Sequence, residues 1–348
     1  MPIPIFTNHK NKILFLVSIA LVFIINLFES SIDTFYFRLI IYIGINIILA
    51  SSLNLINGFT GQFSLGHAGF MAIGGYVSLS LSTYFAPFFQ NLFGTAGFGT
   101  AATFLILLIS AGAAAAVAGF IVGVPSLRLK GDYLAITTLG FGEIIRVIIQ
   151  GLDVVGASQG FSRVYMYESG IKSTQLIEGL NESFAIYTVP KYTNFFWTYF
   201  VVIFVVYFIY SLINSTYGRG FLAVKDDEVA AESMGINTTK FKVLAFVTGA
   251  FFAGVAGSLY GHFNTSLIPE EFNFLKSVEI VVMVIVGGMG SIPGMIISAI
   301  ILTLLPELLR GVQEYRMIVY ALILIIMMLT RPQGLFGLKL KLRKTKKV

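Results

Sequence analysis

The chain has 348 residues, of which 56% are hydrophobic and only 11% are charged, and its mean hydropathy is +0.86. Soluble domains carry about 25% charged residues, so this composition excludes an ordinary soluble protein and indicates a polytopic membrane protein. The chain has no cysteine, which excludes disulfides and thiolate metal sites, and its net charge of +6 needs only membrane topology, not nucleic acid, as its cause.

Hydrophobic runs long enough to cross a membrane recur along the chain. A helix needs about 20 apolar residues to cross roughly 30 Å of hydrocarbon. We therefore predict an all-α integral membrane protein with one transmembrane domain over 1–348 and 8–10 transmembrane helices, some broken by glycines. The eighth and ninth runs, which glycines and Pro293 separate, form either two spans or one re-entrant hairpin. The predicted spans are 12–28, 35–56, 66–86, 100–124, 133–151, 194–213, 243–262, 276–292, 293–309 and 315–330.

The distribution of Lys and Arg predicts the orientation. The first apolar run lacks a cleavage pattern of small residues, so we expect it to stay as a helix and not to act as a signal peptide. With a cytoplasmic N-terminus, fifteen basic residues lie on the inner side and seven on the outer side, which favours both termini in the cytoplasm. This topology gives an external segment at 152–193, a cytoplasmic loop at 214–242 and a basic cytoplasmic tail at 331–348, which anchors the topology and can rest on anionic lipid headgroups.

A polar, glycine-rich stretch interrupts the apolar pattern near the third span. Residues 57–76 read NGFTGQFSLGHAGFMAIGGY, and a second broken segment, VGGMGSIPG, covers 286–294. Glycine-broken segments in both halves of a transporter often mark the substrate site. We therefore hypothesise that both segments flank a translocation path. The alternative is that the glycines only allow close helix packing and the polar groups bond across helices. The candidate path residues are Gly61, Gln62, Ser64, His67, Gly288, Gly290 and Ser291.

Two further patterns within the spans permit more than one interpretation. Glu143 and Arg146 lie three residues apart on the fifth span, which favours a mutual ion pair over a role in gating or in holding a zwitterion. Small residues recur every fourth position from Gly249 to Gly261, and this stripe fits packing within the chain as well as contact with a second permease. The three histidines are too far apart in sequence to indicate a metal site.

The cytoplasmic loop contains a short acidic segment that reads KDDEVAAESMG. Asp226 or Asp227 can cap a helix, and acidic residues in its first turn, Glu228 included, suit the positive end of the helix dipole. Gly235 fits a left-handed stop position. The resulting helix of about eight residues is too short to be stable alone, so it must pack on its own bundle or on another protein.

At this segment the chain resembles the coupling loop of ABC importer permeases, whose motif is Glu-Ala-Ala, then three further residues, then Gly. Ala230, Ala231 and Gly235 keep this spacing, while Val229 occupies the glutamate position and Glu228 comes one residue early. NLINGFTGQFSLGHAGFMAIGGY, LRLKGDYLAITTLGFGEIIR, VGGMGSIPGMIISAIILTLLPELLR and LTRPQGLFG resemble the same branch, so the resemblance covers about 40–337. The family is the LivM-type permease subunit of branched-chain amino-acid ABC importers, with urea and amide permeases as close relatives.

The resemblance implies an ATP-driven importer in a bacterial inner membrane that works by alternating access, and a chain that is not itself an enzyme. It implies two cytoplasmic ATPase subunits, a second related permease and an extracytoplasmic solute-binding protein. The sequence agrees in having no Gly-Lys dipeptide and hence no phosphate-binding loop, so we expect no cofactor in this chain and ATP on its partners. The residues alone leave two other classes open: an ion-coupled secondary transporter, for which Glu143, Glu279 and Glu307 are candidate carboxylates, and a passive channel or scaffold.

Overall fold

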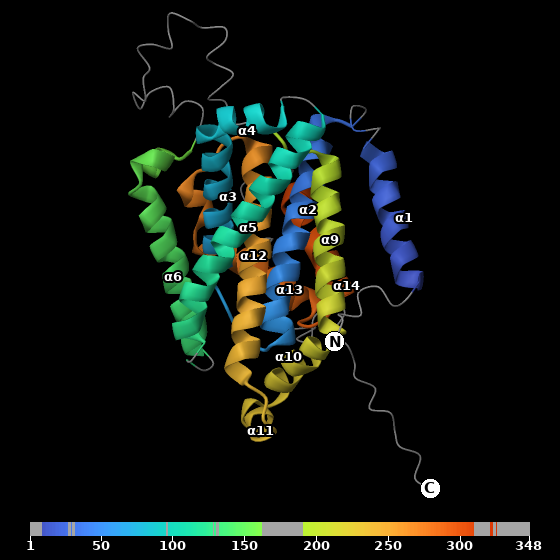
Figure 1. Ribbon diagram of the computed structural model, residues 1–348. Helices are drawn as coiled ribbons and strands as arrows, with labels where there is room; N and C mark the ends of the chain where they lie inside the picture. The colour runs from blue at the N-terminus through green and yellow to red at the C-terminus, as the bar shows by residue number, and fades with distance from the viewer. Residues whose placement is uncertain are drawn as a thin grey trace, which may run out of the picture.

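The computed structural model describes residues 9–26, 29, 32–94, 97–127, 129, 132–161, 191–309, 321, 322 and 325. These residues form a bundle of helices without a β-sheet (Figure 1). The main helices are α1 (His9–Asn26), α2 (Thr34–Asn54), α3 (His67–Tyr84), α4 (Ala86–Phe93), α5 (Phe98–Ser126), α6 (Asp132–Gln150), α9 (Phe195–Ile213), α10 (Thr216–Asp226), α11 (Glu228–Ser233), α12 (Thr238–Asn264), α13 (Phe274–Gly287) and α14 (Ile292–Leu308). Short π or 3-10 turns occur at Leu55–Phe59, Asp153–Val155, Ala157–Gln159 and Pro269–Phe272.

Helix α12 lies at the centre of the bundle. It packs against α5, α3 and α2, while α9 and α1 extend the bundle beyond α2, and α13 and α14 pack on α2 from behind in the view of Figure 1. Helix α11 projects at one end of the bundle and α4 lies at the other. We refer to these as the α11 end and the α4 end.

Side-chain caps set the start of most of these helices. Asp33, Asn194, Asn237 and Asn273 each accept a backbone N–H at the start of α2, α9, α12 and α13, and Ser291 does so for α14. A cap of this kind satisfies donors that have no partner within the first helical turn. The helix boundaries therefore follow from short polar residues that precede each apolar run.

The small-residue stripe of α12 is a contact within the chain. A Cβ atom on Gly257 would lie 1.9 Å from the carbonyl oxygen of Met71, and one on Gly261 would lie 2.4 Å from Leu79, both on α3. Gly74 of α3 has the same relationship to Gly254, where a Cβ would lie 2.2 Å from backbone. Absence of side chains therefore lets the backbones of α3 and α12 approach closely, as in other membrane helix pairs.

Length and composition support the predicted membrane class. Within the described residues, five helical stretches are long and apolar enough to cross a bilayer: Thr34–Phe59, Phe98–Ser126, Tyr133–Gln150, Phe195–Ile213 and Thr238–Asn264. Two shorter apolar helices cover Val17–Asn26 and Ile292–Leu308. The prediction of an all-α polytopic membrane protein is confirmed. The predicted span at 315–330 falls almost wholly outside the described residues, and the tail at 331–348 does so entirely.

Helices α13 and α14 form a hairpin whose turn lies at the α11 end. The turn at 288–291 contacts the C-terminal end of α2, whereas Thr303 of α14 reaches Asn46, further toward the α4 end of α2. At the α4 end, Phe161 pairs with Leu267 through backbone hydrogen bonds of 2.8 and 2.9 Å. Most of the predicted external segment, 162–190, lies outside the described residues.

Candidate functional site

The two glycine-rich segments meet at the α11 end of the bundle. The backbone N–H of Gly290 donates to the side-chain oxygen of Asn54 at 2.9 Å. A Cβ atom on Gly58 would lie 2.0 Å from that oxygen and 2.5 Å from the nitrogen of Gly290. The absence of a side chain at Gly58 therefore permits the contact. We call residues 54–67 together with 287–294 the glycine junction.

Helix α2 ends in a π-helical turn, which was not predicted. Leu55–Phe59 widens the helix, and the chain then runs without regular structure from 60 to 66 before α3 begins. Gly61 adopts φ +70°, which a residue with a side chain rarely does, and the N–H of Gln62 returns to the carbonyl of Ile56 at 3.1 Å. Such turns are frequent at functional positions in helices.

The glycine junction holds a cluster of buried polar atoms without partners among the described residues. Gln62, Ser64 and His67 are at most 5% exposed. Within that part of the chain, neither the oxygen nor the nitrogen of the Gln62 amide has a hydrogen-bond partner, and neither do Asn57 Nδ2, Ser64 Oγ and His67 Nδ1. An unsatisfied buried polar group costs about 1–3 kcal/mol. Bonds between helices therefore do not account for these atoms, although His67 Nε2 does lie 2.8 Å from Ser52 Oγ.

Lys225 links the glycine junction to α10. Its ammonium group donates to the carbonyl oxygen of Gly58 at 2.6 Å, and a Cβ on Gly290 would lie 3.5 Å from the same nitrogen. Sequence reasoning did not single out Lys225. The available signal was its position in the last turn of α10, where a cation suits the negative end of the helix dipole.

The predicted coupling helix is shorter than expected, and a separate helix precedes it. Asp226 is the last residue of α10, so it does not stand in the first turn of the next helix. Asp227 caps α11 and accepts from the N–H groups of Val229 and Ala230 at 2.9 and 3.0 Å. Its extended backbone, φ −159° and ψ 112°, divides the two helices. The segment 214–242 is therefore mostly helical and is not an irregular loop.

Helix α11 packs on its own chain. Glu228 forms an ion pair with Lys242 of α12 at 2.5 Å, and Glu232 accepts from the hydroxyl of Thr238 at 2.6 Å. Ala231 is buried, whereas Ala230 faces outward.

The end of α11 forms a left-handed stop at Gly235. Gly235 has φ +81°, and its N–H and that of Ile236 bond to the carbonyls of Glu232 and Ala231, the Schellman arrangement that ends many helices. Two apolar side chains on this small helical unit remain outside. Val229 is 65% exposed and Met234 82% exposed.

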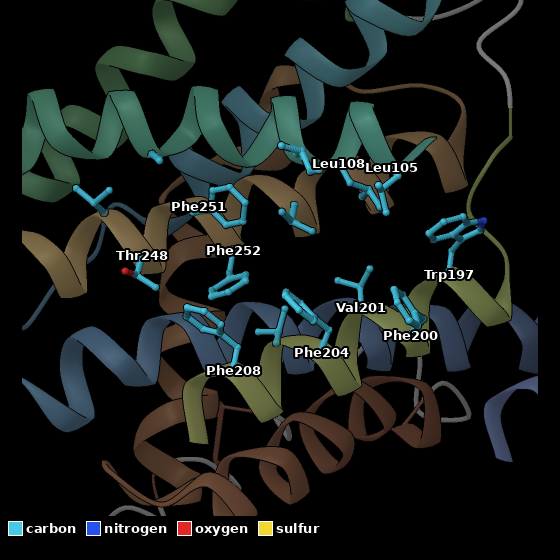
Figure 2. Close-up of a pocket in the computed structure, with 15 residues that line it drawn as sticks. Leu105, Leu108, Trp197, Phe200, Val201, Phe204, Phe208, Thr248, Phe251 and Phe252 are labelled. Carbon is cyan, nitrogen blue, oxygen red and sulfur yellow. The ribbon is translucent and has the colours of Figure 1, made fainter. Parts of the chain in front are cut away.

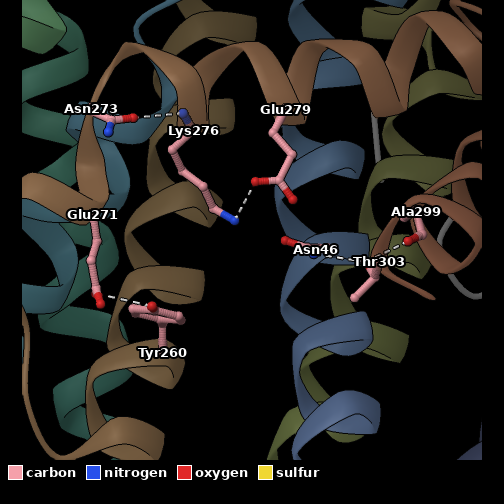
Figure 3. A network of polar contacts seen from close by, with 8 residues as sticks. All are labelled: Asn46, Tyr260, Glu271, Asn273, Lys276, Glu279, Ala299 and Thr303. Carbon is pink, nitrogen blue, oxygen red and sulfur yellow. Dashed lines mark hydrogen bonds and ion pairs between the residues drawn. The ribbon is translucent and has the colours of Figure 1, made fainter. Parts of the chain in front are cut away.

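A polar face runs along α2, α12, α13 and α14 toward the α4 end (Figure 3). Lys276 and Glu279 of α13 form an ion pair at 2.9 Å and point between α12 and α2. On either side, Tyr260 bonds to Glu271 at 3.1 Å and Asn46 to Thr303 at 2.9 Å. Charged groups within spans are rare and usually face a bundle interior or a wet cavity.

The comparisons with known proteins agree on one family. The family model "Branched-chain amino acid transport system / permease component" matches residues 35–328, which include the glycine junction, α10, α11 and the polar face. This chain belongs to that family. It is a multi-pass membrane permease component, as are the other members.

Several relatives show how far the similarity extends. The high-affinity branched-chain amino acid transport system permease protein LivM of Salmonella typhimurium is 36% identical over 301 residues, 84% of this permease and 67% of the relative. LivM of Escherichia coli matches equally well. The probable LivM of Methanocaldococcus jannaschii is 26% identical over 78% of this permease and 80% of its own length. No solved structure matches.

A second permease component also shares part of the chain. LivH of Escherichia coli is 35% identical over 125 residues, which is 35% of this permease and 40% of LivH. Two permease types of common origin therefore occur in this family. This supports the view that the chain is part of an ABC transporter that also contains a second permease.

The predicted ion pair on α6 is present in this permease but not in the bundle interior. Arg146 and Glu143 lie 2.8 Å apart, and their side chains are 24% and 35% exposed. Helix α6 packs on α3 and α5 at the edge of the bundle, so this pair does not lie in the bundle interior, where charged groups within spans usually lie. Their exposure almost equals that of Lys276 and Glu279, at 24% and 34%. The two pairs differ in position: Glu143 and Arg146 lie on the edge helix α6, whereas Lys276 and Glu279 lie on the polar face.

Proposed function

We propose that this permease is one transmembrane subunit of an ABC importer for branched-chain amino acids in a bacterial inner membrane. A second permease completes the path, two cytoplasmic ATPase subunits bind at the α11 end, and an external solute-binding protein delivers the amino acid. The excess of Lys and Arg on one side supports cytoplasmic termini and a cytoplasmic α11 end. The substrate class follows from the relatives, which are branched-chain amino acid transport permeases.

The hydrogen bond from Lys225 to Gly58 is the observation that carries this proposal. It joins the segment that would meet the ATPases to the break at the end of α2. Phe221 strengthens this connection between α10 and the end of α2, since it is fully buried beside Leu55, Phe59 and Ala245. Movement of α10 and α11 is thereby transmitted to α2 and to the α13–α14 hairpin. Rigid units of this kind give alternating access by rocking about a fixed site.

The exposed residues Val229 and Met234 form the proposed contact with an ATPase subunit. Both are apolar side chains at the projecting tip of the bundle, a setting typical of interaction sites. Asp227, Glu228 and Gly235 shape the tip, the exposed Ala230 keeps its surface small, and Ala231 is buried beneath it.

The glycine junction and the polar face together form this subunit's proposed part of the solute path. The buried amide of Gln62 and the imidazole of His67 keep unused hydrogen-bonding capacity at the inner end. Lys276 and Glu279 supply both signs of charge nearer the α4 end, as a zwitterion requires. Gly61, Gly288, Gly290 and Ser291 hold the inner end of the path in shape, and Ser64 adds a buried hydroxyl that has no hydrogen-bond partner among the described residues.

Reconstitution tests the proposal directly. The permease, its partner permease and the ATPases are placed in vesicles with the binding protein, and uptake of labelled leucine is measured. We expect uphill uptake that stops when ATP hydrolysis is blocked. Uptake with no ATPase present would contradict the proposal. Uptake of labelled urea or a short amide, with no uptake of leucine, would instead assign the chain the substrate class of the related urea and amide permeases.

A second experiment tests the α11 contact. Val229→Asp with Met234→Asp should abolish co-purification of the ATPases while leaving the permease folded, because a charge at an apolar contact must be desolvated. Leu275→Asp is the matched control, since Leu275 is 69% exposed but lies on α13, away from α11. ATPase binding that survives the double change would place the contact elsewhere.

An ion-coupled transporter is less well supported. Such a mechanism needs a titratable carboxylate in the membrane. Of the three candidate carboxylates, Glu143 is paired with Arg146 and Glu279 with Lys276, so these two already have a cationic partner.

A further inference from the structure

A long apolar cavity opens on the surface formed by α5, α9 and α12 (Figure 2). Its volume is about 610 Å³. Phe204 and Phe208 of α9 line it opposite Phe251 and Phe252 of α12, and Leu105 and Leu108 of α5 close one wall. Thr248 and Trp197 are the lining residues with a polar side-chain atom. The cavity lies within segments apolar enough to span a bilayer.

A second cavity of about 810 Å³ continues the first toward the α11 end. The two share Phe208, Val247 and Thr248 in their walls, so they form one groove along α12. The second part differs in chemistry, since Tyr217, Asn237, Thr239 and Lys240 line it. An apolar groove therefore leads to a polar mouth.

Lys240 gives the mouth its charge. Its side chain is exposed, and within the described part of the chain no carboxylate forms an ion pair with it. Lys242, two residues later, is buried and paired with Glu228. Lys240 thus presents an uncompensated cation beside the hydroxyl groups of Thr239 and Tyr217.

We propose that this groove binds an anionic phospholipid, with its acyl chain between α5 and α9 and its headgroup at Lys240. The length fits, because Lys240 to Val255 of α12 covers about 22 Å, and one leaflet with its headgroups measures roughly 20–22 Å. Basic pockets between membrane helices on the cytoplasmic side bind acidic lipid headgroups in this way. The lipid belongs to the leaflet at the α11 end.

The apolar part of the groove has a volume of about 610 Å³ and is lined almost wholly by aromatic and aliphatic side chains, which suits an acyl chain. The groove also lies on the α5 and α9 side, whereas the polar face lies on the side of α13 and α14 (Figure 1).

The bound headgroup would contact the first residues of α10 and the cap of α12, the two points at which the α10–α11 unit joins the bundle. Ser215 and Tyr217 stand at the start of α10, and Asn237 caps α12 directly after α11. The lipid therefore lies beside the starts of α10 and α12, the helices that precede and follow α11. The site itself does not depend on the proposed transport function.

The amount of phospholipid that the purified permease retains tests the proposed lipid site. The permease, with the subunits that co-purify, is placed in nanodiscs of phosphatidylcholine and phosphatidylglycerol, extracted, and its retained phospholipid is counted by native mass spectrometry. We expect preferential retention of phosphatidylglycerol. Lys240→Gln should reduce it about fivefold, the factor that one basic residue near an anionic lipid surface contributes. Arg219→Gln is the control, since Arg219 is an exposed cation at the same end that does not line the groove.

A second pair of variants tests the acyl-chain part. Ala116→Phe fills the apolar cavity and should abolish retention of any phospholipid, whereas Ala113→Phe, exposed on the same helix but outside the lining, should not. A benzoylphenylalanine at Phe204 should form a lipid adduct under light. Equal retention of both lipids, loss with Arg219→Gln equal to that with Lys240→Gln, or an adduct with a protein chain would overturn the proposal. Lys240→Gln alters only an exposed side chain, so it decides the matter even if Ala116→Phe prevents folding.

Discussion

The ammonium group of Lys225 lies 2.6 Å from the carbonyl oxygen of Gly58, two residues that are far apart in sequence. The contact connects α10, which precedes the exposed α11 tip, to the π-helical end of α2. Gly58 in turn touches Gly290. Three separate segments therefore meet at one carbonyl and its neighbours, so a displacement of one segment is passed to the others.

Removal of the Lys225 ammonium group should uncouple transport from ATP hydrolysis. Lys225→Met keeps the length of the side chain but cannot donate to Gly58, and loss of a hydrogen bond to a charged group weakens the joint by about 1–3 kcal/mol. We expect ATP hydrolysis to continue while leucine uptake falls at least several-fold. Arg219→Met is the control, because Arg219 bonds to Thr216 of its own helix. Equal defects in both variants would mean that Lys225 has no special role.

A methyl group at Gly58 should destabilise the permease. It would lie 2.0 Å from the side chain of Asn54 and 2.5 Å from the backbone of Gly290, and overpacking of this kind costs about 1–3 kcal/mol. Thermal unfolding in detergent should show a lower midpoint for Gly58→Ala. Gly140→Ala should leave the midpoint unchanged or raise it, since Gly140 lies within α6 and, among the described residues, no atom other than its chain neighbours and its own helix backbone lies within 4 Å of its Cβ position. The prediction is wrong if both changes act alike.

The cap at Asp227 should control the order of α11. Asp227→Ala removes the acceptor of two backbone N–H groups, and the loss of such a cap costs about 0.5–2 kcal/mol. Hydrogen exchange at residues 228–233 should become faster, and binding of the ATPases should weaken. Asp227→Asn retains a capping oxygen and should behave nearly as the parent. Slow exchange in the alanine variant would show that the contacts of Glu228 and Glu232 with α12 suffice.

Opposite effects on stability and uptake should identify Gln62 as a solute-path residue. Within the described residues its amide has no partner for either polar atom, so Gln62→Leu relieves an unsatisfied buried group and should not lower the unfolding midpoint. If the amide serves the solute, uptake should fall even though the protein is at least as stable. Unchanged uptake at equal membrane levels would remove Gln62 from the path, and His67→Leu provides the same test for the imidazole.

The two ion pairs of equal spacing should respond differently to neutralisation. Glu279→Gln with Lys276→Met removes charge from the polar face, and we expect strongly reduced leucine uptake. Glu143→Gln with Arg146→Met removes a pair of almost equal exposure from the edge helix α6, where partly exposed pairs contribute about 0–1 kcal/mol. Uptake should remain near normal. A greater loss of leucine uptake in the α6 variant than in the α13 variant would instead place the Glu143–Arg146 pair in the solute path.

The sequence by itself determined the class of the protein and the position of most helices. Hydrophobic runs separated by short polar caps such as Asn194 and Asn237 define helices locally, because an apolar helix satisfies its own backbone bonds in lipid. The left-handed stop at Gly235 was also predicted, since that geometry depends on one residue and its neighbours. The family resemblance rested on similarly local motifs.

Only the tertiary structure decided which segments meet. The sequence left open whether the α12 stripe faces its own chain, and the backbone of α3 at Met71 and Gly75 supplies the answer. Neither the bond from Lys225 to Gly58 nor the amide of Asn54 beneath Gly290 was predictable, since these partners are separated by 167 and 236 residues. Side-chain periodicity reports on burial along one helix, whereas such contacts depend on how several helices pack together.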